Sequence, residues 1–230
     1  MRDEATARNA LVEALGMEKT TWPLPILNQG RDARRAVVAT YGEPTEAVEI
    51  IQQMIWLNRR IGKSSVVLLA VLVDAQLASG DAPAAAATGQ ALLAQLEGSR
   101  NQHHLIYARV NVAAACLALD DRLRARPLLE SGWSQTRVFD HMRPRFADYL
   151  ALFAALDGRY EAAARLAGYA DAGYVAFDFP RDANEAAAVE RARSLARAAL
   201  GAERFERLQT EGASLREEFI SSLAFGTASR

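Results

Sequence analysis

Apolar residues recur three and four positions apart through most of the 230-residue chain. This spacing places apolar side chains on one face of an α-helix, whereas a half-buried strand alternates apolar and polar residues. Alanine, the strongest helix former, supplies 47 of the residues. The pattern therefore predicts an all-α protein.

A helix-closing residue followed five positions later by an alanine recurs four times along the chain. The pairs are Gly42/Ala47, Gly80/Ala85, Asp120/Ala125 and Gly158/Ala163, separated by 38, 40 and 38 residues. Glycine takes the left-handed backbone that ends a helix, and aspartate does so with some strain. The alanine lets the next helix approach closely. Two helices per period of this length are typical of an α-solenoid.

The chain is expected to divide into three segments. Residues 1–29 form an N-terminal helix and a connector, because the prolines of Trp22-Pro23-Leu24-Pro25 exclude a helix interior. Residues 30–180 form four irregular helix-hairpin repeats, and residues 181–226 form a C-terminal helical cap. In the cap, the charged side chains of the long helix are expected on its outer face; they are Glu190, Arg191, Arg193 and Arg197.

Charge and cysteine content exclude several classes of protein. The 27 basic and 28 acidic residues give a net charge of −1, which disfavours direct nucleic-acid binding. The single cysteine, Cys116, excludes an intrachain disulfide and indicates a reducing, cytoplasmic setting. The longest uncharged apolar run, Val66–Val73, is far below the ~18 residues of a membrane span.

Candidate chemical motifs are sparse. Gly62-Lys63-Ser64 lacks the earlier glycine of a phosphate-binding loop, since Leu57 stands there, and it predicts a helix start capped by Ser64. The three histidines (His103, His104 and His141) do not have the spacing of a metal site. Cys116 lies in an apolar run and is expected to be a small buried apolar residue. We therefore expect no metal, no cofactor and no catalysis.

Two stretches carry a family resemblance. The segment 162–168, together with the Leu-Gly-Ala-Glu and Glu-Gly-Ala blocks within 195–225, resembles the C-terminal end of bacterial transcriptional regulators. These regulators join a winged-helix or LuxR-type DNA-binding domain, an ATPase and a tetratricopeptide-like sensor. The segment 62–96 is similar to their sensor solenoids, including the maltose-regulator type. The repeats here average about 39 residues against 34 in a tetratricopeptide unit.

The resemblance implies a ligand-binding groove lined by the first helix of each hairpin. The residues that would face it are Gln29, Asp32, Asp74, Tyr107, Arg145 and Asp148, with Asn111 as a neighbour. These residues differ from the Lys/Asn clamp with which tetratricopeptide domains hold acidic peptide tails. For Asp74 and Asn111, hydrogen bonding between helices is an equally good interpretation.

The sequence thus predicts a non-catalytic sensor module of a bacterial transcriptional regulator that binds a protein or a small-molecule effector. DNA-binding and ATPase domains would lie elsewhere in a longer chain, and no membrane contact is expected. The alternative is a stand-alone helical-repeat scaffold or dimerisation domain, in which exposed faces of the second helices pair with another copy of the chain.

Overall fold

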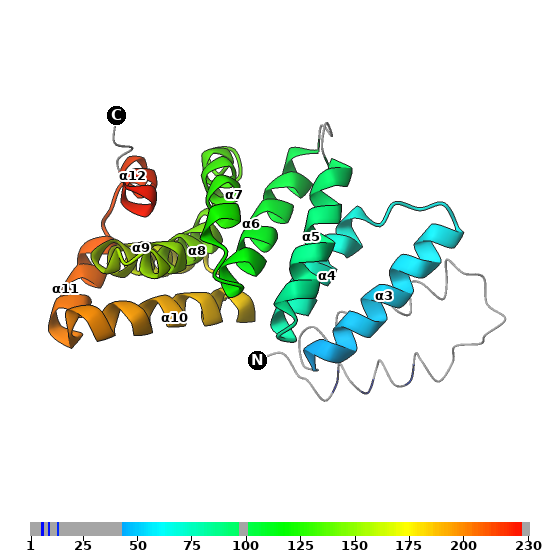
Figure 1. The fold of residues 1–230 in the computed structure, drawn as a ribbon, viewed down its shortest axis with the longest axis horizontal. Coiled ribbons are helices and arrows are strands. Elements are labelled where there is room, and N and C mark those ends of the chain that lie inside the picture. The colour runs from blue at the N-terminus through cyan, green and yellow to red at the C-terminus, as the bar shows by residue number, and fades with distance from the viewer. Residues whose placement is uncertain (1–5, 7–8, 10–12, 14–42, 97–100, 227–230) are drawn as a thin grey trace. The chain divides into compact units, whose positions relative to one another are not determined.

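The computed structural model describes residues 43–96 and 101–226, together with Thr6, Asn9 and Glu13 (Figure 1). Every regular element in this part of the chain is helical, which confirms the all-α prediction. Contacts divide the chain into two compact units, Met1–Glu97 and Gly98–Arg230, and each is described by itself. The division falls inside the segment 30–180, which the sequence analysis treats as one array of repeats.

Unit 1 contains three described helices. They are α3 (Pro44–Arg60), α4 (Val66–Ala78) and α5 (Ala82–Leu96). Pro44 starts α3, where a missing N–H costs nothing because the first turn has no acceptor for it. The apolar face of α3 packs on α4, and α4 pairs with α5. Pro44 and Gly80 of the sequence pattern therefore mark helix boundaries here.

Unit 2 contains two helix pairs followed by the C-terminal helices. The elements are α6 (Gln102–Ala118), α7 (Arg122–Gln135), the 3₁₀ turn η1 (Asp140–Met142), α8 (Arg143–Leu156), α9 (Tyr160–Phe177), α10 (Ala183–Leu200), α11 (Ala202–Gly212), η2 (Glu217–Phe219) and α12 (Ile220–Phe225). Helix α10 packs along α8 and α9, and α11 packs on α9 (Figure 1). Helix α8 is the centre of the unit, with Phe146 and Leu150 fully buried.

The hairpin turns have the predicted geometry. Gly80, Asp120 and Gly158 have φ angles of +85°, +56° and +75°. Each matching alanine is buried, and the aspartates beside the first two turns cap the following helices, with Asp121 Oδ1 accepting from the Arg124 amide at 3.1 Å. Three of the four predicted turns are confirmed. The fourth, at Gly42, lies outside the described residues, as does the Trp22–Pro25 connector.

Helices α9 and α11 touch backbone to backbone. A Cβ added at Gly168 would lie 1.9 Å from the carbonyl oxygen of Gln209, and one added at Gly212 would lie 2.0 Å from that of Arg165. A glycine on each helix, facing the backbone of the other helix, therefore permits a crossing that no larger residue allows. This crossing holds α11 against α9 and shapes the surface beside the two helices.

One expectation for the cap is wrong at a single position. Glu190, Arg191 and Arg197 are exposed on α10, as predicted, but Arg193 is only 20% exposed and its guanidinium turns inward. The reason is a carboxylate on α9, Asp171, which lies within reach of the long arginine side chain.

Candidate functional site

Four of the predicted groove residues lie in unit 2: Tyr107, Asn111, Arg145 and Asp148. Tyr107 lies on α6 and is half-buried, while Arg145 and Asp148 lie one turn apart on α8. Asp74 on α4 and Asn111 on α6 are half-buried. Gln29 and Asp32 lie outside the described residues. Ligand binding by this set stays a prediction, but Arg145 and Asp148 both belong to a network of charged side chains.

Asp148 is fully buried and is held by one arginine. Arg181, in the loop between α9 and α10, donates from Nε to Asp148 Oδ2 at 2.8 Å and from Nη2 to Oδ1 at 3.0 Å. Its guanidinium also stacks 4.4 Å from the ring centre of Tyr174. This paired, planar contact is the geometry in which arginine binds carboxylates most strongly.

Asp171 on α9 joins the remaining elements of the network. It accepts hydrogen bonds from Arg181, from Arg193 of α10 and from Gln209 of α11, at 2.8, 2.6 and 2.9 Å. One carboxylate therefore ties the α9–α10 loop, α10 and α11 together. We call Asp148, Asp171, Arg181, Arg193 and Gln209 the clasp.

A second set of ion pairs extends the clasp to the start of α10. Arg145 pairs with Asp182 and, at 3.3 Å, with the buried Glu185. Burial lowers the pKa of Arg145, but the two acids outweigh it, with Tyr107 contributing, and the pKa lies above its ordinary value. Arg145 is therefore a fixed positive charge that holds α10 to α8.

The electrostatics of the clasp favour a structural role. Burial raises the pKa of Asp148 to about 7, while the hydrogen bonds from Arg181 act in the opposite direction. Burial and then Asp148 raise the pKa of Tyr174, and the acids around Arg181 keep its pKa high despite burial. A carboxyl that titrates near neutrality can serve as a general base. Asp148 is fully buried behind Arg181, however, so a substrate cannot reach it in this conformation.

An open groove of about 620 Å³ lies beside the clasp, between α9 and α11. Its lining residues are Gly168, Asp171, Ala172, Val175 and Ala176 from α9, and Glu206, Gln209, Thr210 and Ala213 from α11. Asp171 and Gln209 belong to both groove and clasp. The groove is therefore bordered by two residues of the clasp.

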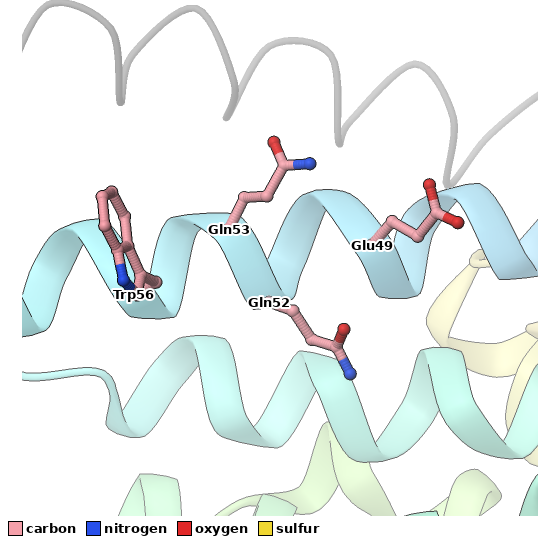
Figure 2. A pocket seen from close by; sticks show the side chains of 4 residues that line it. All are labelled: Glu49, Gln52, Gln53 and Trp56. Carbon is pink, nitrogen blue, oxygen red and sulfur yellow. The ribbon is translucent and has the colours of Figure 1, made fainter.

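Unit 1 has its own surface hollow, of about 410 Å³, on α3. The described residues that line it are Glu49, Gln52, Gln53 and Trp56, and Figure 2 shows Glu49 and Gln53 pointing to one side of the helix and Gln52 to another. Trp56 is 54% exposed, with the Arg60 guanidinium 4.7 Å from its ring centre. These four exposed side chains do not converge on one point.

The three histidines lie close together, which the sequence analysis did not foresee. The ring of His103 on α6 lies 5.0 Å from that of Tyr107, 5.5 Å from that of Phe139 and 6.3 Å from that of His141. Within the described residues no group of three or more His, Cys, Asp or Glu side chains could hold a metal ion. The histidines form part of an aromatic cluster at the ends of α6 and η1.

Two further motifs have structural roles. A helix begins here as predicted, but the N-cap of α4 is Ser65 and not Ser64. Ser64, one position earlier, accepts a hydrogen bond at Oγ from the amide of Val66, the first residue of α4, at 3.4 Å. Cys116 is buried on α6, and burial raises the pKa of its thiol, which makes it a poor nucleophile.

Most residues of the clasp and of the ion pairs beside it were not expected from the sequence. Asp171, Arg181, Glu185 and Gln209 were not predicted, although Asp148 and Arg145 were. The available signal was the excess of arginine, 25 residues against 2 lysines, since arginine is the residue of choice for buried ion pairs. Composition does not say which arginine meets which acid.

Comparison of the chain with protein-family models, with curated proteins and with solved structures finds no match. Among the helices in residues 43–96 and 101–226, none has the length and apolar character needed to cross a membrane.

Proposed function

We propose that this chain is a non-catalytic binding module: an α-solenoid of tetratricopeptide-like hairpins that acts as the sensor part of a bacterial transcriptional regulator in the cytoplasm. The single observation that carries the proposal is the sharing of Asp171 and Gln209 between the groove and the clasp. Through these residues, occupation of the groove alters the contacts that hold α10. A sensor needs such a link between a binding surface and a second structural state.

Three features support binding rather than chemistry. The left-handed turns and buried alanines recur with a two-helix period, as in repeat proteins that present binding surfaces. The charged groups of the clasp neutralise one another. The one carboxyl with a pKa near neutrality, Asp148, is inaccessible. The resemblance of the segments 62–96, 162–168 and 195–225 to bacterial transcriptional regulators is the basis for assigning the module to such a regulator.

The proposal is tested by a thermal-shift screen of metabolites, sugars and peptides on the intact chain. We expect at least one compound to raise the melting temperature and to slow hydrogen exchange in α10, with the compound recovered unchanged by NMR. Conversion of a hit into a product would contradict the non-catalytic assignment. A hit that leaves exchange in α10 unchanged would contradict the link between groove and cap.

A scaffold or dimerisation role is the second candidate, and one observation favours it. Large apolar side chains are exposed on second helices: Leu123 on α7 is 90% exposed and Val175 on α9 is 82% exposed. Light scattering over a dilution series separates the two roles. A dimer that persists at the lowest concentration supports the scaffold, and a monomer throughout supports the sensor.

A further inference from the structure

We infer that the groove between α9 and α11 docks an amphipathic helix of a partner protein, with an apolar face and lysine or arginine beside it. The inference rests on the proposed function and names the class of partner for the groove. Such helix-in-groove docking uses apolar residues at positions i, i+3 or i+4, and i+7 of the bound helix.

The α9 wall of the groove is apolar and accessible. Ala172, Val175 and Ala176 share one face of α9 because they are three and four positions apart. Val175 is 82% exposed although it is a large apolar residue, and Ala176 is exposed beside it. Covering this wall would remove a continuous apolar surface from water, which favours association.

The α11 wall is acidic. Glu206 lines the groove, and Glu203 lies one turn earlier on the same face of α11. Both carboxylates are exposed and neither forms an ion pair within the described part of the chain, whereas the nearby arginines Arg204 and Arg207 are already paired with Glu161 and Glu211. Two unpaired negative charges beside an apolar wall are complementary to a helix that carries basic residues.

The size of the groove sets the length of the docked segment. The α9 wall runs from Gly168, where the two helices touch, to Ala176, a distance of about 12 Å for eight steps at the rise of an α-helix. This length accommodates about two turns of a partner helix. The contact is small, so we expect a dissociation constant of about 10 to 100 µM, as in transient complexes.

The test is a selection of random 16-residue peptides displayed on phage against the intact chain, with the Val175→Glu variant as the negative selection. We expect the enriched peptides to carry apolar residues at helical spacing together with Lys or Arg. Binding of a synthetic consensus peptide, measured by calorimetry, should weaken at least tenfold with Val175→Glu. It should be unchanged with the matched control Leu123→Glu, which alters an equally exposed apolar residue on α7.

Charge exchange then tests the acidic wall. The Glu203→Lys/Glu206→Lys variant should bind the basic peptide at least threefold more weakly and should bind a peptide with Glu in place of Lys more tightly than the wild type does. Circular dichroism and melting temperature confirm that each variant is folded.

Three results would overturn the inference: no peptide that distinguishes the wild type from Val175→Glu, an acidic consensus, or self-association of the wild type that Val175→Glu abolishes. The last result would make a second copy of the chain the occupant. If the metabolite screen yields a ligand that the Val175→Glu variant still binds, the docked helix is excluded while the proposed function stands. If neither the metabolite screen nor the peptide selection yields a ligand, both the proposed function and the docked helix are contradicted.

Discussion

At the scale of single residues, the absence of a side chain decides how close two helices lie. Gly168 has no room for a Cβ because the carbonyl oxygen of Gln209 occupies its position, and this oxygen belongs to the backbone, which cannot rotate away. Gly173 differs, because the atoms nearest to its added Cβ belong to the ring of Pro144, at 2.8 Å. Substitution by alanine is therefore expected to change the free energy of unfolding by different amounts at Gly168 and Gly173.

Gly168→Ala is expected to lower the free energy of unfolding by about 3 kcal/mol or more, since α11 must move away from α9. Gly173→Ala should lower it less, because the nearest atom, Pro144 Cγ, lies 2.8 Å from the added Cβ, whereas the nearest atom at Gly168 lies 1.9 Å away, so a much smaller shift relieves the contact. Urea unfolding of both variants checks the order. Equal effects, or a negligible effect at Gly168, would mean that the two helices are not in backbone contact.

Asp120 gives a second prediction at the residue scale, because it adopts the left-handed conformation that glycine adopts in the turns at Gly80 and Gly158. Asp120→Gly should be more stable than Asp120→Ala by about 1 kcal/mol, the approximate cost of left-handed backbone for a residue with a Cβ. Both variants lose the exposed ion pair to Arg191, so their difference isolates the backbone. Equal melting curves would refute the strain assigned to this turn.

At the scale of elements, the cap is attached by charged side chains as well as by apolar packing. Arg181→Met leaves the Asp148 carboxylate buried without its cation, and removing one partner of a buried pair costs about 3 to 5 kcal/mol. We expect this loss at about pH 8. The control Arg124→Met removes an exposed pair with Asp121 and should change stability far less. Chemical denaturation of both variants tests whether the clasp matters.

The raised pKa of Asp148 predicts a specific dependence on pH. Its folded value of about 7 exceeds the unfolded value of about 4, so between these pH values the folded state holds a proton that the unfolded state has released. The contribution of Asp148 to stability is therefore largest in acid and falls as pH rises through this window.

Asp148→Asn provides the reference, since asparagine resembles the protonated acid and does not titrate. The free energy of unfolding of the wild type minus that of the variant should fall by up to about 1.4 kcal/mol per pH unit between about pH 4 and pH 7. Urea titrations at several pH values measure it. A difference that rises with pH would mean that Arg181 outweighs burial.

The elements also divide into those that sequence can predict and those that it cannot. The hairpin turns were predictable because Gly80, Asp120 and Gly158 act locally, through their own backbone angles. The clasp was not predictable, because Arg181 and Asp148 are 33 positions apart, and 25 arginines and 28 acids offer many alternative pairs. The inward turn of Arg193 was missed for the same reason, since helical periodicity alone assigns it to the outer face.

At the scale of the molecule, each unit combines locally specified hairpins with long-range contacts that the hairpins bring together. In unit 2 the long-range contacts converge on Asp171, which links a surface groove to the helix that packs along α8 and α9. The predicted groove residues Arg145 and Asp148 lie behind this helix and hold it. We therefore propose that Asp171 couples binding at the surface groove to the packing of α10.

Hydrogen exchange of the Asp171→Asn variant, followed by mass spectrometry, tests this claim most directly. Removing the charge weakens the bonds from Arg181 and Arg193, and charge-assisted bonds contribute about 1.5 to 3 kcal/mol each, so amides of α10 should exchange about tenfold faster or more. The matched control is Glu206→Gln, which changes an acid of the same groove that makes no ion pair within the described residues, and α10 should keep its wild-type exchange rate. Wild-type exchange in α10 of Asp171→Asn, or equal acceleration in the control, would contradict the account.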